Sequence, residues 1–274
     1  MISKNVLKTD AIRPLLRNRI QNGRGGFAAY LMLGYPDYET SVEAMIAVAK
    51  EGADIIEIGI PFSDPIADGP VIQHAGTIAI ANGVHPADTW AAARTIRKRT
   101  KALPVVMTYA NIPMQYGFAR FAHDACQAGV RGIILPDVPP ELFPEELLVL
   151  NPIFLASPLT IPNRLELLVN KTHGFLYIMS NLGITGEQRF YDPRIRYIVN
   201  HVNQMDSNLP KLLGFGVHDF KSAQNALACG MDGVIVGSAL IQALGDGGDI
   251  SLLSNVVRDI IRGLKKRPKL ILES

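Results

Sequence analysis

Eight short apolar runs, separated by segments of helical periodicity, constrain the fold of this 274-residue chain more than any other feature. Each run is apolar almost without interruption, which is typical of strands covered on both faces in a parallel sheet. The runs cover residues 27–33, 54–60, 104–110, 131–137, 152–156, 175–180, 211–216 and 232–238.

The segments between these runs have the spacing of amphipathic helices, and several of them end in glycine, a common helix stop. They include residues 41–52, 88–99, 117–129 and 220–230. Eight strand–helix units without a break in composition predict an α/β fold, a (β/α)₈ TIM barrel that forms one domain over residues 1–274. An open doubly wound sheet is the alternative, but the segment after the first run, GYPDYETS, lacks its glycine-rich phosphate loop.

An extra helix is predicted before the first strand, because apolar residues recur there at roughly helical spacing among basic ones. These residues are Leu7, Ile12, Leu15, Leu16 and Ile20. The N-terminal segment has no apolar signal core, and no apolar run is long enough to cross a membrane. We therefore expect a cytoplasmic protein.

Charge and cysteine content exclude several classes of function. The formal net charge is +2 with acids and bases interspersed, whereas a nucleic-acid-binding protein would need a clustered basic stripe. Cys126 and Cys229 have no metal-ligand spacing and are predicted to be buried thiols in a reducing compartment. The six histidines form no metal motif, and no serine elbow is present.

Glu57 is the candidate with the strongest chemical implication. Side-chain alternation along residues 54–60 places it on the face inside the barrel, while Ile56 and Ile58 face the helices. Burial disfavours the charged carboxylate and raises its pKa, which would make it a proton donor near neutral pH. A structural glutamate paired with a buried lysine or arginine is the alternative, but the nearby strands offer few partners.

Two aspartates, Asp64 and Asp68, follow in a loop that is rich in proline. An isolated aspartate in such a loop usually bonds its own backbone in a turn. Their closeness to Glu57 indicates that one of them takes part in acid/base chemistry, and the spacing does not choose between them.

Glycines at the ends of the last two strands, GFG (214–216) and VGS (236–238), predict a phosphate site. In many barrels the loops after strands seven and eight bind phosphate through backbone N–H groups. The alternative is a pair of tight turns, with Ser238 capping the following helix. Tyr177 shares its strand face with residues 175 and 179 and either reaches the site or belongs to the core. Lyase, isomerase and aldolase chemistry all fit, although a Schiff base would have to use Lys211 at a strand start.

The segment GADIIEIGIPFSDPIADGPVIQ (52–73) closely resembles the signature of the tryptophan synthase alpha chain family. The resemblance extends over nearly the whole chain through GYPD (34–37), TYAN (108–111), PDVPPE (136–141), YIMSNLGITG (177–186), GFG and VGSAL (236–240). It implies a (β/α)₈ barrel and a lyase of tryptophan biosynthesis. The implied reaction cleaves indole-3-glycerol phosphate to indole and glyceraldehyde 3-phosphate by a retro-aldol step, without cofactor or metal. The implied partner is a pyridoxal-phosphate beta chain in an alpha2beta2 complex.

The resemblance also implies a role for each matching residue. Glu57 matches the catalytic acid/base, Asp68 the group that bonds the indole N–H, and Tyr177 the active-site tyrosine, whereas Asp64 matches a loop residue on the partner side. Thr185 matches a lid threonine that bonds the loop aspartate. The implied indole pocket contains Tyr30, Met107 and Ile134. The implied phosphate cradle contains Gly186, Phe215, Gly216, Gly237 and Ser238.

The chain departs from the family pattern at Met32, where threonine is common, and at Asn181-Leu182, where a polar lid residue is usual. The segment 137–152 is shorter than typical, which predicts a trimmed helix after strand four. These departures keep two alternatives open. One is a stand-alone lyase that releases indole, and the other is a catalytically weak subunit with a binding or allosteric role.

Overall fold

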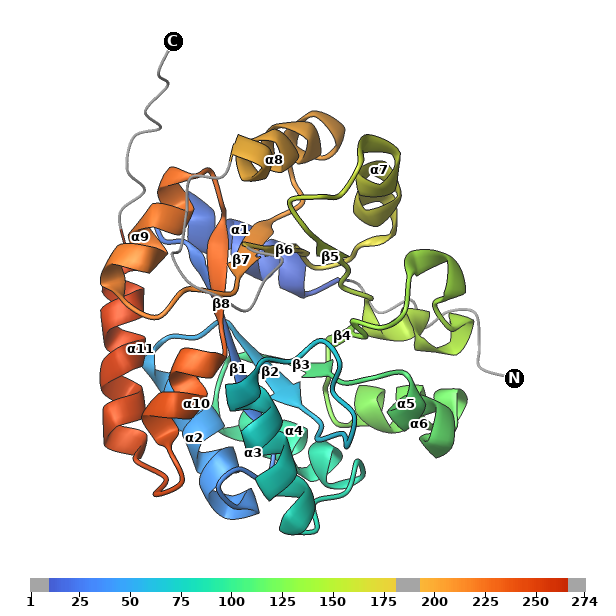
Figure 1. Cartoon of the computed structure of the whole chain (residues 1–274), viewed down its shortest axis with the longest axis vertical. Coiled ribbons are helices and arrows are strands. Elements are labelled where there is room, and N and C mark those ends of the chain that lie inside the picture. The colour runs from blue at the N-terminus through green and yellow to red at the C-terminus, as the bar shows by residue number, and fades with distance from the viewer. Residues whose placement is uncertain (1–9, 181–192, 266–274) are drawn as a thin grey trace.

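The computed structural model describes residues 10–180 and 193–265, and these form an eight-stranded parallel barrel inside a ring of helices (Figure 1). The strands are β1 (Gly26–Met32), β2 (Ile55–Gly59), β3 (Leu103–Met107), β4 (Gly132–Ile134), β5 (Leu155–Ala156), β6 (Leu176–Met179), β7 (Lys211–Gly214) and β8 (Gly233–Val236). Their order is β4-β3-β2-β1-β8-β7-β6-β5. A parallel bridge between Ile133 of β4 and Pro152, just before β5, closes the ring of strands. The predicted barrel is thereby confirmed.

Most of the helices lie between successive strands on the outside of the barrel, whereas α1 precedes β1, and α10 and α11 follow β8 (Figure 1). The helices are α1 (Ile12–Gln21), α2 (Tyr38–Glu51), α3 (Pro70–Ala81), α4 (Asp88–Arg99), α5 (Asn111–Tyr116), α6 (Phe118–Gln127), α7 (Pro162–Lys171), α8 (Pro193–Met205), α9 (Phe220–Ala228), α10 (Ser238–Leu244) and α11 (Ile250–Leu264). Between β4 and β5 the chain forms two 3₁₀ turns, η1 (Pro140–Leu142) and η2 (Glu145–Leu150), instead of an α-helix. Residues 137–152 therefore form two 3₁₀ turns where the sequence predicts a trimmed α-helix.

Two apolar cores lie on the two faces of the sheet. Ile56 and Ile58 belong to the larger core between the strands and the outer helices, whereas Ile55 belongs to the core inside the barrel. The alternation predicted along β2 is therefore confirmed. Glu57 lies on the same inward face as Ile55 and is fully buried.

Helix α1 closes the amino-terminal end of the barrel. Its Ile12 and Leu16 are fully buried in the inner core, and they contact the glycines at which β4 and β1 begin. Asp10 caps the helix by accepting hydrogen bonds from the backbone N–H groups of Ile12 and Arg13, at 3.0 and 3.1 Å. The N-terminal helix predicted from the sequence is confirmed from Ile12 onward.

Buried ion pairs stabilise this same end of the barrel. Lys211, at the start of β7, lies 2.6 Å from the Asp232 carboxylate, and both side chains are almost completely buried. Asp54 accepts hydrogen bonds from Arg19 at 2.7 Å and from Arg24, and a backbone N–H reaches it at 3.0 Å. Lys211 is thus held at the opposite end from the carboxyl ends of the strands.

Two local expectations need correction. Cys126 and Cys229 are partly exposed and not buried, because each lies at the solvent-facing end of an outer helix. Ser238 is the first residue of α10, and Gly237 takes the N-cap position, with no side-chain cap hydrogen bond. Across residues 10–180 and 193–265, no helix combines the length and apolar character needed to cross a bilayer.

Candidate functional site

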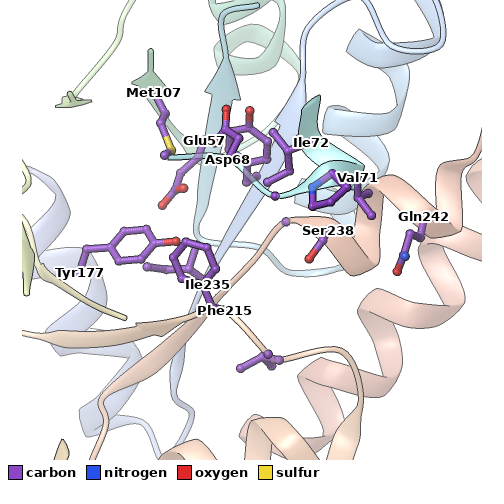
Figure 2. A pocket seen from close by; sticks show the side chains of 16 residues that line it. Glu57, Asp68, Val71, Ile72, Met107, Tyr177, Phe215, Ile235, Ser238 and Gln242 are labelled. Atoms are coloured by element: carbon purple, nitrogen blue, oxygen red, sulfur yellow. The ribbon is translucent and has the colours of Figure 1, made fainter. Parts of the chain in front are cut away.

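A pocket of about 250 Å³ opens at the carboxyl ends of the strands, where barrel enzymes place their active sites. The predicted residues that line it are Tyr30, Glu57, Asp68, Met107, Tyr177, Phe215, Gly216, Gly237 and Ser238. Figure 2 shows Glu57, Asp68 and Met107 at one side of the pocket, with Ser238 and Gln242 at the other. Residues far apart in the sequence thus meet around one cavity.

Glu57 points into this pocket from the middle of β2, between Tyr30 of β1 and Val105 of β3 in the strand register. Its side chain is fully buried, and neither carboxylate oxygen has a hydrogen-bond partner among the described residues. Burial without compensation raises the pKa of Glu57 to about 8. A buried carboxyl group that stays protonated near neutral pH, and that faces a cavity, is suited to donate a proton to a ligand.

Asp68 reaches the pocket from the loop between β2 and α3, whereas Asp64 does not. The Asp64 side chain is exposed, accepts a hydrogen bond from the Ser63 hydroxyl, and lines a groove on the outer surface of the loop. Burial raises the pKa of Asp68 to about 6, and a hydrogen bond from Tyr109 opposes the rise. The structure therefore separates the two aspartates that sequence spacing left equivalent.

Two tyrosines bring phenol rings to the same pocket. Tyr30 and Tyr177 are 5% and 6% exposed, so each belongs to the core and also lines the cavity. Burial raises the pKa of both phenols well above the usual value, and the nearby Glu57 and Asp68 add to the effect. Both hydroxyls are therefore neutral hydrogen-bonding groups near neutral pH. The Tyr177 ring also meets Phe215 edge to face, with centroids 6.2 Å apart.

The apolar wall is built from side chains of several strands. Met107 ends β3 and lines the pocket, and Ile235 of β8 lines it from the other side. Ile134 is fully buried in the inner core, and Met107 packs against that core. Ile134 is paired with Met107 in the strand register, but it is not among the residues that line the pocket. A flat apolar ligand could occupy this end of the cavity.

The far end of the pocket is formed mainly by backbone after β7 and β8. Phe215 and Gly216 have φ angles of 70° and 80°, which turn the chain sharply after β7. A Cβ atom on Gly237 would lie 3.3 Å from the Tyr30 ring, so glycine allows a close approach there. Ser238 starts α10, whose first N–H groups have no partner within the helix. Such a backbone arrangement can bind a phosphate group.

Two of the predicted site residues, Thr185 and Gly186, lie outside the described residues, as do Asn181 and Leu182. Sequence reasoning missed seven residues that line the pocket, among them Gly69, Pro70, Val217 and Ile235. The others are Val71 and Ile72 of α3 and Gln242 of α10. In the sequence, Val71 and Ile72 are marked only by their position just after Asp68. Gln242 is marked only by its position one helical turn after Ser238.

Comparison with known proteins agrees with this geometry. Residues 16–262 match the family model described as "Tryptophan synthase alpha chain". A tryptophan synthase alpha chain of Methanosarcina mazei is 36% identical, and the match covers 95% of this chain and 97% of that protein. One from Mycobacterium intracellulare is 40% identical over 90% of this chain and 91% of its own.

Solved structures give the same result. A structure of Mycobacterium tuberculosis tryptophan synthase superposes with a TM-score of 0.86 at 35% identity, covering 94% of this chain and 99% of that chain. A structure from Aquifex aeolicus superposes with a TM-score of 0.83 at 35% identity, covering 93% and 99%. The barrel, the pocket at the carboxyl ends of its strands and these matches lead to one conclusion: the chain belongs to the tryptophan synthase alpha chain family.

Proposed function

We propose that this pocket cleaves indole-3-glycerol phosphate to indole and glyceraldehyde 3-phosphate, the carbon–carbon lyase reaction of the family in tryptophan biosynthesis. The observation that carries the proposal is the Glu57 carboxyl group, which is buried, has no hydrogen-bond partner among the described residues and faces the cavity. An unsatisfied buried acid is costly to the fold unless a ligand uses it.

Glu57 acts as both acid and base in the proposed retro-aldol step. Its protonated carboxyl group donates a proton to the indole ring carbon that bears the side chain, and an indolenine cation forms. The resulting carboxylate then accepts the proton of the side-chain hydroxyl. The carbon–carbon bond breaks, its electron pair returns to the ring, the hydroxyl carbon becomes an aldehyde, and Glu57 regains its proton. A pKa of about 8 suits both half-steps near neutral pH.

Asp68 is proposed to accept a hydrogen bond from the indole N–H. Once the ring carbon is protonated, positive charge spreads to this nitrogen, and a carboxylate beside it stabilises the cation more than the neutral substrate. This role needs an ionised Asp68 while Glu57 is still protonated. With pKa values of about 6 and about 8, both conditions hold between these two pH values.

The rest of the pocket is proposed to orient the substrate. Tyr30, Met107 and the core above Ile134 enclose the flat indole, and Tyr177 contacts the region between the ring and the side chain. Phe215, Gly216, Gly237 and Ser238 supply backbone N–H groups and one hydroxyl for the phosphate. Thr185 and Gly186, outside the described residues, are proposed to complete the site from the loop after β6.

A beta chain that carries pyridoxal phosphate is the proposed partner. The M. tuberculosis relatives were solved as tryptophan synthase. On this chain, the loop between β2 and α3 exposes Ile66 to 84%, beside the surface groove that contains Asp64. An apolar side chain this exposed at the rim of the active site is a natural contact for a partner.

The test is indole release from indole-3-glycerol phosphate by the purified chain, with and without a beta chain. Glu57→Gln is expected to lower turnover about 10²-fold or more, the typical contribution of a proton-transfer group. Turnover that is strong and unchanged by a beta chain would favour a stand-alone lyase. Equal indole release by wild type and Glu57→Gln would favour a binding or allosteric subunit.

A further inference from the structure

We propose that Tyr109 is a positioning residue for Asp68, because its hydroxyl binds the backbone of Ala67, next to Asp68, and its ring packs against the start of the same loop. The inference rests on the proposed function, since it concerns how the carboxylate beside the indole N–H is held. Tyr109 follows β3 and does not line the pocket around Glu57, but it lines a small adjoining cavity together with Asp68. In this proposal it acts on the substrate through the loop.

The hydroxyl group of Tyr109 acts on two consecutive residues of the loop. It accepts the backbone N–H of Ala67 at 3.0 Å. It also interacts with the Asp68 carboxylate. Because the hydroxyl holds the backbone of the preceding residue, it restricts where the Asp68 side chain lies.

The ring of Tyr109 holds the other end of the same loop. It stacks on Phe62 with centroids 5.2 Å apart and an interplanar angle of 28°. Phe62 lies near the start of the loop formed by residues 60–69, and Asp68 lies near its end. Tyr109 is only 5% exposed, so both contacts are made by a side chain that is itself immobilised by burial.

The backbone around Tyr109 is anchored to strands other than β2. The N–H of Thr108 donates to the carbonyl of Ile134 at 3.1 Å, and the N–H of Ala110 donates to the Asp137 carboxylate at 3.0 Å. The loop that carries Asp68 is therefore tied, through one tyrosine, to the neighbouring β3–β4 part of the barrel. Site residues held in this way keep their geometry better than residues on an unsupported loop.

Other contacts hold the loop backbone but leave the carboxylate to Tyr109. Gln73 of α3 donates to the backbone carbonyl of Asp68 at 2.9 Å, and the N–H of Asp68 donates to the carbonyl of Pro65 at 3.1 Å. Neither bond involves the Asp68 side chain. Loss of the Tyr109 hydroxyl removes the bond to Ala67 but leaves these two, so it should displace the carboxylate without releasing the loop.

The interaction with Tyr109 also tunes the charge of Asp68. A phenol that donates to a carboxylate favours the ionised form, so it lowers the pKa of Asp68 against the effect of burial. Without the hydroxyl, the pKa of Asp68 rises. A larger share of the enzyme then carries a neutral Asp68 at mildly acidic pH, where it cannot stabilise the cation.

The experiment is steady-state indole release by Tyr109→Phe over the acidic limb of the pH profile. Phenylalanine keeps the ring that stacks on Phe62 and removes only the hydroxyl. We expect kcat to fall between about tenfold and a hundredfold, as for one hydrogen bond to a charged group. We also expect KM to change less than kcat, and the acidic limb of kcat/KM to move to higher pH.

Tyr116→Phe is the matched control. The Tyr116 hydroxyl also accepts one hydrogen bond and donates another, from Trp90 at 2.9 Å and to Asp124 at 2.6 Å, but it lies among the outer helices. This variant should keep the wild-type kcat and acidic limb. Thermal unfolding of both variants shows whether the fold is equally preserved. Equal losses of kcat in the two variants would overturn the positioning role.

Combining Tyr109→Phe with Asp68→Asn separates the two proposals. If Tyr109 acts through Asp68, the second substitution should cost little further activity once Asp68 is gone. The positioning role alone is overturned if Tyr109→Phe lowers activity as much in the Asp68→Asn background as in the wild type. It is also overturned if Tyr109→Phe keeps the wild-type pH profile while Asp68→Asn is inactive. A fully active Asp68→Asn would instead remove the proposed function of Asp68, and the inference with it.

Discussion

Glu57 is expected to destabilise the fold that it serves, and Glu57→Gln should reveal by how much. Burial raises the pKa of Glu57 from 4.5 to about 8. Between these values the folded chain keeps the proton, whereas the unfolded chain has released it. The unfolded state therefore binds fewer protons, and the free energy of unfolding falls as the pH rises. The loss is fully developed only above the pKa of the folded state.

The size of the effect follows from the pKa difference. Each pH unit in this interval lowers the free energy of unfolding by about 1.4 kcal/mol. Between about pH 5 and pH 8 the wild-type chain should lose about 4 kcal/mol that Glu57→Gln does not lose. An unpaired buried amide carries its own cost of about 1–3 kcal/mol, but that cost does not depend on pH.

The assay is urea unfolding of wild type and Glu57→Gln at several pH values between these limits. The difference in free energy of unfolding should grow steadily in favour of the variant, while indole release by the variant stays low at every pH. Glu146→Gln is the control, because Glu146 is exposed and should leave the two curves parallel. Parallel curves for Glu57→Gln would refute the reasoning, since Glu57 would then be ionised or paired in the folded chain.

Three further predictions concern other residues. Asp68→Asn should lower kcat about 10²-fold or more, and wild-type kcat/KM should fall below about pH 6 as Asp68 is protonated, both measured by indole release. Gly214→Ala should displace Tyr177, whose ring atoms would lie within 2.4 Å of the new Cβ, and should destabilise the fold by about 1–3 kcal/mol in urea unfolding. Lys211→Met should cost about 3–5 kcal/mol by removing the buried cation that lies beside the Asp232 carboxylate, yet the folded fraction should keep its kcat, because this lysine lies at the far end of the barrel. Loss of turnover in fully folded Lys211→Met would contradict its structural role.

The positions that follow from periodicity were predictable from the sequence. The apolar runs gave the eight strands, and the alternation along β2 gave the inward face of Glu57, because both depend only on local backbone geometry. Helix α3 was not predicted, because its first residues, beginning with Pro70, belong to the acidic, proline-rich segment after β2 that was interpreted as a loop.

Other parts of the site depend on contacts between distant segments. The difference between Asp64 and Asp68 arises from the course of the loop and from Tyr109, which is 41 residues beyond Asp68 in a different strand unit. The conversion of the β4–β5 connection into two 3₁₀ turns could be anticipated only as a shortening. Neither effect has a periodic signature, because each is decided by packing in three dimensions.

Helix α1 closes the amino-terminal end of the barrel interior, so the pocket lies toward the other end. Ile12 and Leu16 fill the base, Glu57 lies above them on the wall, and Ser238 lies on the rim side. The pocket that Glu57 lines opens at the carboxyl ends of the strands, away from α1. Whatever covers that opening decides when indole leaves and where it goes.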